Sequence, residues 1–323
     1  CDAGREGELI FRFVMEKADC KKPVKRLWIS SMEESAIRKG FENLKDGKDY
    51  DSLYRSAFCR AKADWLVGIN ATRLFSLLYN HTLNVGRVQS PTLKMLVERS
   101  EAITNFKKEK YYHVRLILDG AEAVSERFSS KETAEKTAES CKGKTAVCTF
   151  VTSEKKETLP PKLFDLTSLQ KEANRIFGYT AKQTLDLAQS LYEKKLLTYP
   201  RTDSRYLTED MITSTVNNIL GKNDFDTERI KVVFNSKKVM DHHAIIPTVS
   251  SLSEDISKLP ESEAKVYRLI FNKLHASVGY PLIENTTKIV ATFDGFEFTS
   301  SGKVIVDEGF TKYLREYKSK RKE

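Results

Sequence analysis

The chain has 323 residues, of which 40% are hydrophobic and 31% charged, a balance typical of a globular protein with two or more domains. This excludes a disordered chain, and no apolar run approaches the roughly 18 residues that a membrane helix needs. A formal net charge of +9 favours polyanionic partners, nucleic acid above all, because Lys and Arg release counterions condensed on phosphates. Five scattered cysteines without a C-x-x-C pair argue against a zinc ribbon and a disulfide framework, and they suit a reducing cytoplasm.

The first third of the chain is predicted to be mainly helical. Apolar side chains recur at helical spacing over residues 8–18, after a turn that contains glycines, and residues 25–30 are typical of a short strand. The stretch 32–105 again follows a helical pattern. Within it, Pro91 suits the first turn of a helix, with Ser90 as its cap.

Beyond residue 105 the pattern changes to strands, then helices, then strands again. A polar helix with a serine cap is expected over residues 129–143, and a proline-rich boundary over 158–165. Because strands stand on both sides of the second helical region, we expect a helical domain at 162–280 to be inserted into a sheet domain. The basic tail 312–323 is expected to be a solvated end. The predicted strands cover 111–120, 144–154 and 287–309, and the predicted helices cover 166–178, 180–195 and 261–279.

The opening stretch DAGREGE, residues 2–8, gathers carboxylates around two glycines. Asp2, Glu6 and Glu8 offer the hard oxygen ligands that Mg²⁺ prefers, and Gly4 and Gly7 let the backbone approach a phosphate closely. An acidic helix N-terminus, stabilised by the helix dipole, accounts for the same residues without any metal. Spacing alone slightly favours the helix N-terminus.

The stretch NVGRVQSPTL, residues 84–93, joins a glycine turn to polar side chains at the start of a helix. Arg87, Gln89 and Ser90 carry guanidinium, amide and hydroxyl groups, all of which bind phosphates or base edges. A capped helix with incidental polar residues is an equally good explanation.

In LLTYPRTDS, residues 196–204, a tyrosine stands between a buried-looking segment and a polar turn. A phenol has a pKa near 10 and needs a nearby cation to act as a nucleophile, which Arg201 supplies. Pro200 restricts the backbone around Tyr199. The alternative is a packed tyrosine before a turn whose polar residues bond locally.

In DHHAIIPT, residues 241–248, two histidines precede a short apolar run. One imidazole could contact a phosphate or carry the proton of a leaving hydroxyl, whereas a pair of strand histidines, one of them buried, is the simpler alternative. The sequence contains no G-x-x-x-x-G-K-[ST] loop, so no ATP site is predicted.

Taken in this order, the motifs resemble those of the type IA DNA topoisomerases. Their residues are most similar to those of the bacterial topoisomerase III branch. The series also includes RAKADWLVGINATR and PPKLFDLTSLQKEAN. The resemblance implies a multi-domain α+β fold of toroidal shape. Its expected parts are a partial Toprim α/β domain (1–58), a helical single-strand-groove domain (59–105), a β-rich arch domain (106–161 and 281–323) and an inserted helical domain with the tyrosine (162–280).

The resemblance implies an isomerase that breaks and rejoins one DNA strand without ATP, relaxing negative supercoils and decatenating DNA. Tyr199 would form a 5′-phosphotyrosyl intermediate, Arg201 would stabilise the transition state, and His242 would contact the phosphate. Mg²⁺ is the implied cofactor. The implied metal ligands are Asp2 and Glu6, and the implied DNA-binding residues are Asp64, Gly86, Arg87, Gln89 and Ser90.

Two departures from the family pattern bear on activity. Gly4 stands where the second acid of an Asp-x-Asp motif is usual, and the upstream glutamate and lysine of the Toprim fold are absent from a chain that starts at Cys1. We therefore expect a fragment that also lacks the C-terminal part, binds single-stranded DNA weakly and cleaves it poorly. The expected protein is a monomer acting on single-stranded or negatively supercoiled DNA, away from membranes, in a bacterial cytoplasm at the nucleoid. The alternatives are a non-catalytic DNA-binding module and, less favoured, a tyrosine recombinase.

Overall fold

The fold was determined as a computed structural model, and it describes residues 1, 3–29, 34–118, 120–221, 225–239, 241–293 and 295–317. Helices and strands alternate in blocks along the chain, as the sequence pattern predicts. The elements up to residue 141 are α1 (Arg5–Lys17), β1 (Lys25–Arg26), α2 (Glu34–Glu42), β2 (Lys45–Asp46), α3 (Asp51–Leu78), α4 (Gln89–Thr104), β3 (Arg115–Leu118), β4 (Ala121–Ser125) and α5 (Lys131–Cys141). The later elements are β5 (Val147–Thr158), α6 (Leu166–Phe177), α7 (Ala181–Glu193), α8 (Ile212–Ser214), a π-helix (Thr215–Leu220), α9 (Thr227–Val233), α10 (Glu261–Val278), β6 (Leu282–Phe293) and β7 (Phe296–Asp307).

The N-terminal elements pack around a buried carboxylate. Glu8 on α1 is fully buried, and its two oxygens bind the side chains of Arg12 and Arg26, each at 2.8 Å. This double pairing joins α1 to β1, because a buried carboxylate is tolerated only with charged partners. The strand predicted at 25–30 is shorter than expected, since only Lys25 and Arg26 pair with β2, and residue 30 lies outside the described ranges.

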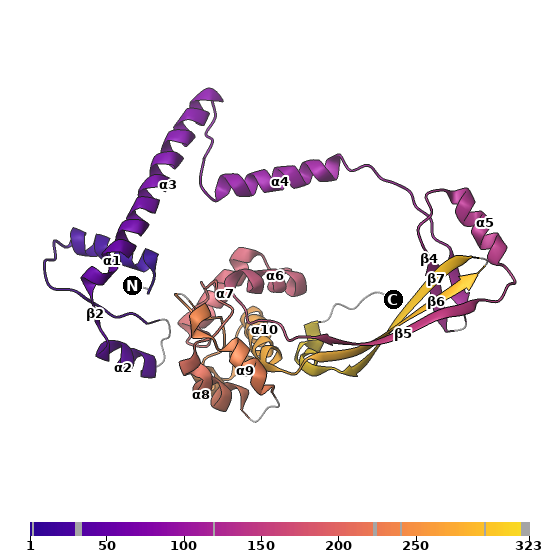
Figure 1. The fold of residues 1–323 in the computed structure, drawn as a ribbon. Coiled ribbons are helices and arrows are strands. Elements are labelled where there is room, and N and C mark those ends of the chain that lie inside the picture. Colours follow the sequence, from indigo (N-terminus) through magenta and orange to yellow (C-terminus); the bar gives the residue numbers. More distant parts are fainter. Residues whose placement is uncertain are drawn as a thin grey trace.

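Two long helices, α3 and α4, extend away from this N-terminal part (Figure 1). They expose large apolar side chains, among them Trp65, Leu77 and Met95. The predicted cap of α4 is wrong by two residues, because Val88 and not Ser90 precedes the first helical residue. The helix begins at Gln89, and the Ser90 hydroxyl accepts a hydrogen bond from the backbone N–H of Gly86 at 3.2 Å.

Five strands form one antiparallel sheet in the order β3-β4-β7-β6-β5. The short strand β4 was not predicted, because its sequence AEAVS shows only weak alternation. Helix α5 packs on one end of the sheet around the fully buried Phe298. The other end is a ribbon of three strands, β5, β6 and β7, each of 12 residues.

The helices between β5 and β6 enclose two apolar cores. One is centred on Leu169, Leu191 and Ile270, and the other on Leu207, Ile246 and Leu274. Helices α6 and α7 both begin with a reciprocal capping box, at Asp165 with Ser168 and at Thr180 with Gln183, which satisfies backbone N–H groups that a helix start leaves without partners.

The tail was expected to be solvated, and its first part is not. Residues Gly309–Tyr317 form a 3-10 helix, η7, that packs beside α10. Tyr317 lies against Phe177 with ring centroids 6.3 Å apart, and its carbonyl accepts a hydrogen bond from Arg175 at 3.1 Å. Aromatic residues spaced among the lysines and arginines of this tail explain the packing. Residues 318–323 lie outside the described ranges.

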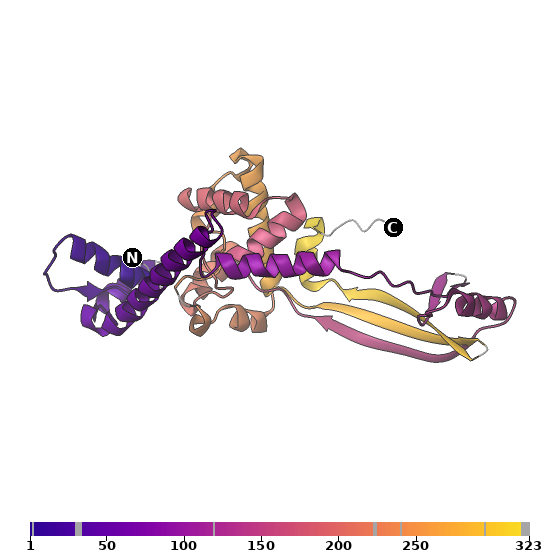
Figure 2. The same cartoon turned by 90° about the horizontal axis from the view of Figure 1, so that it is seen from above.

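In space the chain follows an arc (Figure 1). It runs from α1 and α2 along α3, across α4 to the sheet, and back along β5 to α6–α10. Figure 2 shows the ribbon of β5, β6 and β7 extending from these helices toward α5. This is the mixed helix-and-strand architecture that the sequence predicts. No helix in the described part of the chain is long and apolar enough to cross a membrane.

Candidate functional site

The predicted nucleophile segment is held by a second segment far along the chain. The backbone N–H of Thr198 donates to the carbonyl of Ile246 at 2.9 Å, and Ile246 donates in return to the Thr198 hydroxyl at 3.0 Å. Leu197 forms an isolated bridge with Pro247. These bonds bring LLTYPRTDS and DHHAIIPT side by side, so the two motifs form a single site.

Tyr199 lies at this junction between two aromatic rings. Its ring centroid is 4.5 Å from that of His242 at an interplanar angle of 49°, and 5.4 Å from that of Tyr192 at 72°. Tyr199 is half-buried and the following Pro200 is buried. The ring is therefore confined by packing, whereas its position at the edge of the core leaves access to a substrate.

The other residues around Tyr199 differ in their surroundings. Thr202 donates its hydroxyl to the carbonyl of His242 at 3.0 Å, which ties the loop to the histidine. Burial lowers the pKa of His243, whose ring nitrogen bonds the carbonyl of Ala244 at 2.8 Å, so this imidazole is neutral near pH 7. Arg201, by contrast, is exposed to solvent.

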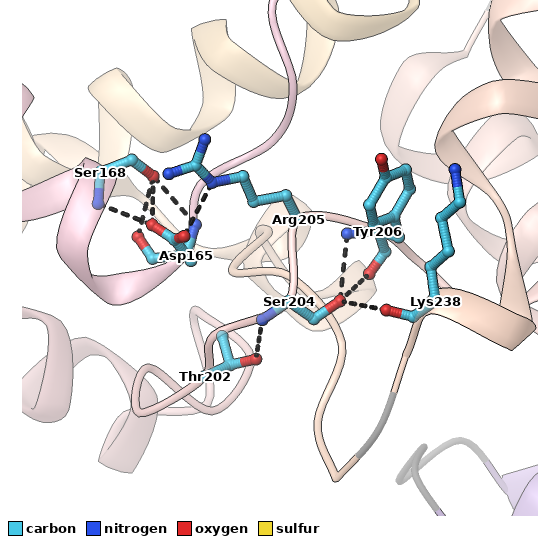
Figure 3. Close-up of polar contacts among 7 residues, drawn as sticks. All are labelled: Asp165, Ser168, Thr202, Ser204, Arg205, Tyr206 and Lys238. Carbon is cyan, nitrogen blue, oxygen red and sulfur yellow. Dashed lines mark hydrogen bonds and ion pairs between the residues drawn. The ribbon is translucent and has the colours of Figure 1, made fainter.

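A polar network fixes the other end of the loop (Figure 3). Asp165 accepts hydrogen bonds from the backbone N–H of Ser168 at 2.6 Å and from the Arg205 side chain at 2.7 Å. The backbone N–H of Leu166 donates to the carbonyl of Thr202 at 3.0 Å. The start of α6 and the loop after Tyr199 are thus joined by both side-chain and backbone bonds.

The predicted groove residues cluster between α3 and α4. The Arg87 side chain donates to Asp64 at 2.8 Å, so the aspartate orients the guanidinium. Gly86 and Ser90 bond each other twice, at 3.2 Å and 3.1 Å, and Gln89 begins α4 with an exposed side chain. Arg87 is more than half exposed and stays available to an anion.

Only one of the two predicted metal ligands lies in the described part of the chain. Asp2 lies outside the described ranges. The carboxylate of Glu6 contacts the guanidinium of Arg60 on α3 and lies 3.7 Å from that of Arg5. No group of three or more His, Cys, Asp or Glu side chains placed to hold a metal occurs among the residues that the structure describes.

Gly4 lies directly against Asp241, the residue before His242. A Cβ built on Gly4 would lie 2.4 Å from Oδ1 of Asp241, far inside van der Waals contact. The carboxylate of Asp241 would have to move to admit a side chain at position 4. The contact places the DAGREGE loop next to the histidine motif.

Three contributors to the site were not predicted from the sequence: Tyr192, Thr202 and Asp241. Tyr192 is the last aromatic residue of α7, seven residues before Tyr199, and aromatic spacing of this kind is usual in cores. Thr202 is part of the tyrosine motif, and its polar side chain was the available signal. No sequence signal points to the contact between Asp241 and Gly4, because it depends on how distant segments pack.

The sequence matches the model of one protein family, described as DNA topoisomerase, over residues 48–323. The relatives include DNA topoisomerase 3 of Bacillus licheniformis, 41% identical over 329 residues, and that of Bacillus subtilis, 40% identical over 329 residues. Each alignment covers 96% of this chain and 45% of the relative, so the chain spans about half the length of the curated relatives it matches.

A solved structure has a similar fold. The full-length topoisomerase I of Thermotoga maritima matches with a TM-score of 0.74 over 97% of this chain and 54% of that chain. The sequence identity is 24%, so this likeness supports the fold alone. The predicted resemblance to type IA topoisomerases is confirmed at the level of family and fold.

Proposed function

Because the chain belongs to the DNA topoisomerase family, we propose that its protein breaks and rejoins one DNA strand with Tyr199 as nucleophile. The observation that carries this proposal is the packing of Tyr199 against His242, at 4.5 Å between ring centroids, where the two sequence motifs meet. The ring contact holds the proposed nucleophile next to an imidazole, and covalent catalysis uses such a neighbour when a substrate brings the two groups into hydrogen-bond reach.

In the proposed reaction the phenol oxygen of Tyr199 attacks a backbone phosphorus of single-stranded DNA. The phenol gives up its proton as its oxygen bonds to phosphorus, the bond from phosphorus to the 3′-oxygen breaks, and the leaving 3′-oxygen takes up a proton to become a hydroxyl. One phosphate ester replaces another, so the 3′-hydroxyl can reverse the attack and reseal the strand without ATP. Strand passage between these two steps would change DNA topology.

The side chains around Tyr199 would act on charge and position. The exposed guanidinium of Arg201 can approach the phosphate and stabilise the charge that builds on its oxygens. His242 would contact the same phosphate or carry the proton of the leaving oxygen. Thr202 would keep the loop in register with His242 through its hydroxyl bond.

The proposed path of the single strand continues to the groove between α3 and α4. The exposed guanidinium of Arg87, oriented by Asp64, and the exposed amide of Gln89 offer phosphate and base contacts. Gly86 leaves room for the backbone of the strand to approach the start of α4, and the amide of Gly86 is already bonded to Ser90.

Mg²⁺ stays a prediction for the DAGREGE loop. The described residues do not fit a metal site by themselves, since Glu6 contacts Arg60 and no third ligand is nearby. No step above is therefore assigned to a metal. The toroidal shape, the four domain boundaries, the monomeric state, independence from ATP and a place at the bacterial nucleoid are likewise proposals that rest on the family.

The proposal predicts a covalent protein–DNA adduct that depends on the phenol oxygen of Tyr199. The full-length protein is incubated with a single-stranded oligonucleotide labelled at either end and then denatured. We expect the adduct to retain the DNA on the 3′ side of the break, with tyrosine on its 5′-phosphate, and Tyr199→Phe to reduce trapping at least about a hundredfold.

Tyr192→Phe is the matched control, because it removes a hydroxyl from the neighbouring ring and should leave trapping near the parent level. A 3′-phosphotyrosyl adduct would contradict the proposal and favour the recombinase alternative. Equal trapping by the parent and Tyr199→Phe would show that another residue is the nucleophile. No trapping at all by the full-length parent would favour the non-catalytic binding module.

A further inference from the structure

A second tyrosine, Tyr206, ends the loop that begins at Tyr199. The backbone carbonyl of Tyr206 accepts a hydrogen bond from the N–H of Ala244 at 2.9 Å. The hydroxyl of Thr198, just before the nucleophile, donates to the carbonyl of the same Ala244 at 3.1 Å. Both ends of the loop therefore meet at Ala244. Tyr206 follows Tyr199 by seven residues along the chain.

The position of Tyr206 is fixed by the buried Ser204 (Figure 3). The backbone N–H of Tyr206 donates to the Ser204 hydroxyl at 3.2 Å, and this hydroxyl lies 3.3 Å from the Tyr206 carbonyl and 3.5 Å from that of Lys238. The same serine thus joins the loop to η4 (Ser236–Lys238). The half-buried ring of Tyr206 is presented from a rigid base.

Two lysines from other parts of the chain lie over this ring. The Nζ of Lys162, in the segment before α6, is 5.5 Å from the ring centroid, and that of Lys238 is 4.8 Å from it. Both distances are within the range of cation–π attraction. Lys162 and Lys238 are exposed, whereas the residues that follow them, Leu163 and Val239, are buried, so each lysine extends from an anchored backbone.

The cluster has excess positive charge. Neither lysine forms an ion pair with a carboxylate in the described part of the chain. Hydrogen bonding and charge from Lys162, with a further contribution from Lys238, lower the pKa of the Tyr206 phenol despite its partial desolvation. Arg229 also lies close enough to Tyr206 to interact with it electrostatically, but Asp226 offsets its charge, and the guanidinium is anchored by the carbonyl of Pro160 at 3.2 Å. Unpaired like charges repel one another, so an anion would stabilise this arrangement.

We propose that Lys162, Tyr206 and Lys238 form a binding subsite for one nucleotide of single-stranded DNA, beside the position that reacts with Tyr199. The two ammonium groups bind the phosphate, and the phenol ring gives a face on which the base stacks. This inference rests on the proposed function, because the strand at Tyr199 supplies the ligand. It adds that the DNA strand continues along the Tyr199–Tyr206 loop and is bound a second time at the Tyr206 end of this loop.

The test measures binding apart from cleavage. Full-length protein carrying Tyr199→Phe is titrated with a single-stranded oligonucleotide at several salt concentrations, with and without Lys162→Gln plus Lys238→Gln. We expect roughly tenfold weaker binding, and a salt slope smaller by about 0.7 for each phosphate that the lysines no longer neutralise. Tyr206→Leu, which removes the ring, should weaken binding without changing the slope.

Lys265→Gln is the matched control, because this lysine belongs to the same inserted helical region and pairs with Glu261 at 2.6 Å. It should change neither the affinity nor the slope. Thermal unfolding of each variant checks that the fold is kept. If the Tyr199→Phe parent binds no single-stranded DNA, the proposed function itself fails. If the parent binds and the double variant behaves like Lys265→Gln, this subsite is refuted. Weakened binding of an acidic polypeptide with unchanged oligonucleotide affinity would also overturn it.

Discussion

At the scale of single residues, Asp165 links the loop after Tyr199 to the core. It caps α6 through Ser168 and holds Arg205 of the loop. Burial tends to raise the pKa of its carboxyl, but the hydrogen bonds from Ser168 and Arg205 outweigh burial and the net pKa is lowered. The ionised form is therefore favoured by folding, and the carboxylate contributes to stability when it is charged.

Asp165→Ala should lower the free energy of unfolding at pH 7 by about 1–3 kcal/mol, since it removes a cap and a charged hydrogen-bond partner. The lower folded-state pKa means that this contribution is complete above the unfolded-state pKa, about 3.9. It is lost as the pH falls through the folded-state value, so urea unfolding should show the two proteins converging below about pH 4. Thr167→Ala, at an exposed position of the same helix, is the control. A difference that stays constant down to about pH 3 would contradict this role.

The sequence pointed to candidate site residues only where the signal was local. The tyrosine and histidine motifs were identified from adjacent residues. The ring contact between Tyr199 and His242 was beyond sequence reasoning, because it depends on Thr198 pairing with Ile246 across a long intervening segment. The solvent exposure of the Arg201 side chain could not be predicted from the sequence either.

At the scale of elements, α7 and α10 are joined by a buried carboxylate. Glu263 on α10 accepts hydrogen bonds from the Ser190 hydroxyl at 2.9 Å and from the Lys194 ammonium at 2.5 Å. Glu263 is only 7% exposed, whereas the Lys194 side chain is 43% exposed, so solvent screens part of the attraction. This pairing holds the helix that leads into LLTYPRTDS against the longest helix of its core.

Glu263→Ala should lower the free energy of unfolding by about 2 kcal/mol, since it leaves Ser190 and Lys194 without their acceptor and opens a gap between the helices. Denaturant unfolding measures this loss. Glu261→Ala, on the same helix but paired with Lys265 at the surface, should leave the stability close to that of the parent, because solvent screens an exposed ion pair. Equal effects of the two substitutions would show that the buried pairing is not important for packing.

The elements themselves were the most predictable part of the fold. Helices α6, α7 and α10 fall close to their predicted ranges, because each has a regular apolar stripe and a local start or stop signal, such as Gly178 with φ 72° after α6. Strand β4 was missed because alanines and a glutamate give little alternation. The docking of η7 was missed because lysines and arginines dominate the composition there and hide its aromatic face.

At the scale of the whole molecule, the contact of Gly4 with Asp241 joins the N-terminal loop to the tyrosine site. Gly4→Asp would set a second carboxylate into the space of the first, so we expect the two segments to separate and covalent trapping to fall about tenfold. Asp241→Gly in the same protein should restore part of this loss, since it removes the collision.

Trapping yields of the parent, the two single variants and the double variant form a double-mutant cycle. We expect a coupling of about 1–2 kcal/mol, within the range for residues in direct contact. Gly302→Asp is the control, because nothing lies within 4 Å of a Cβ at that position. Strict additivity of the two changes would refute the contact as a feature of the working enzyme.

The three-stranded ribbon has a mechanical consequence. The helical segment with Tyr199 lies between β5 and β6 in the chain. These two strands are paired with each other over nearly their full length. Twelve residues at about 3.3 Å each give a lever of about 40 Å. A bend of about 10° at the end near α5 would carry the other end through about 7 Å. We therefore expect a small bend of this ribbon to move the segment that carries Tyr199 by several times the shift at its origin.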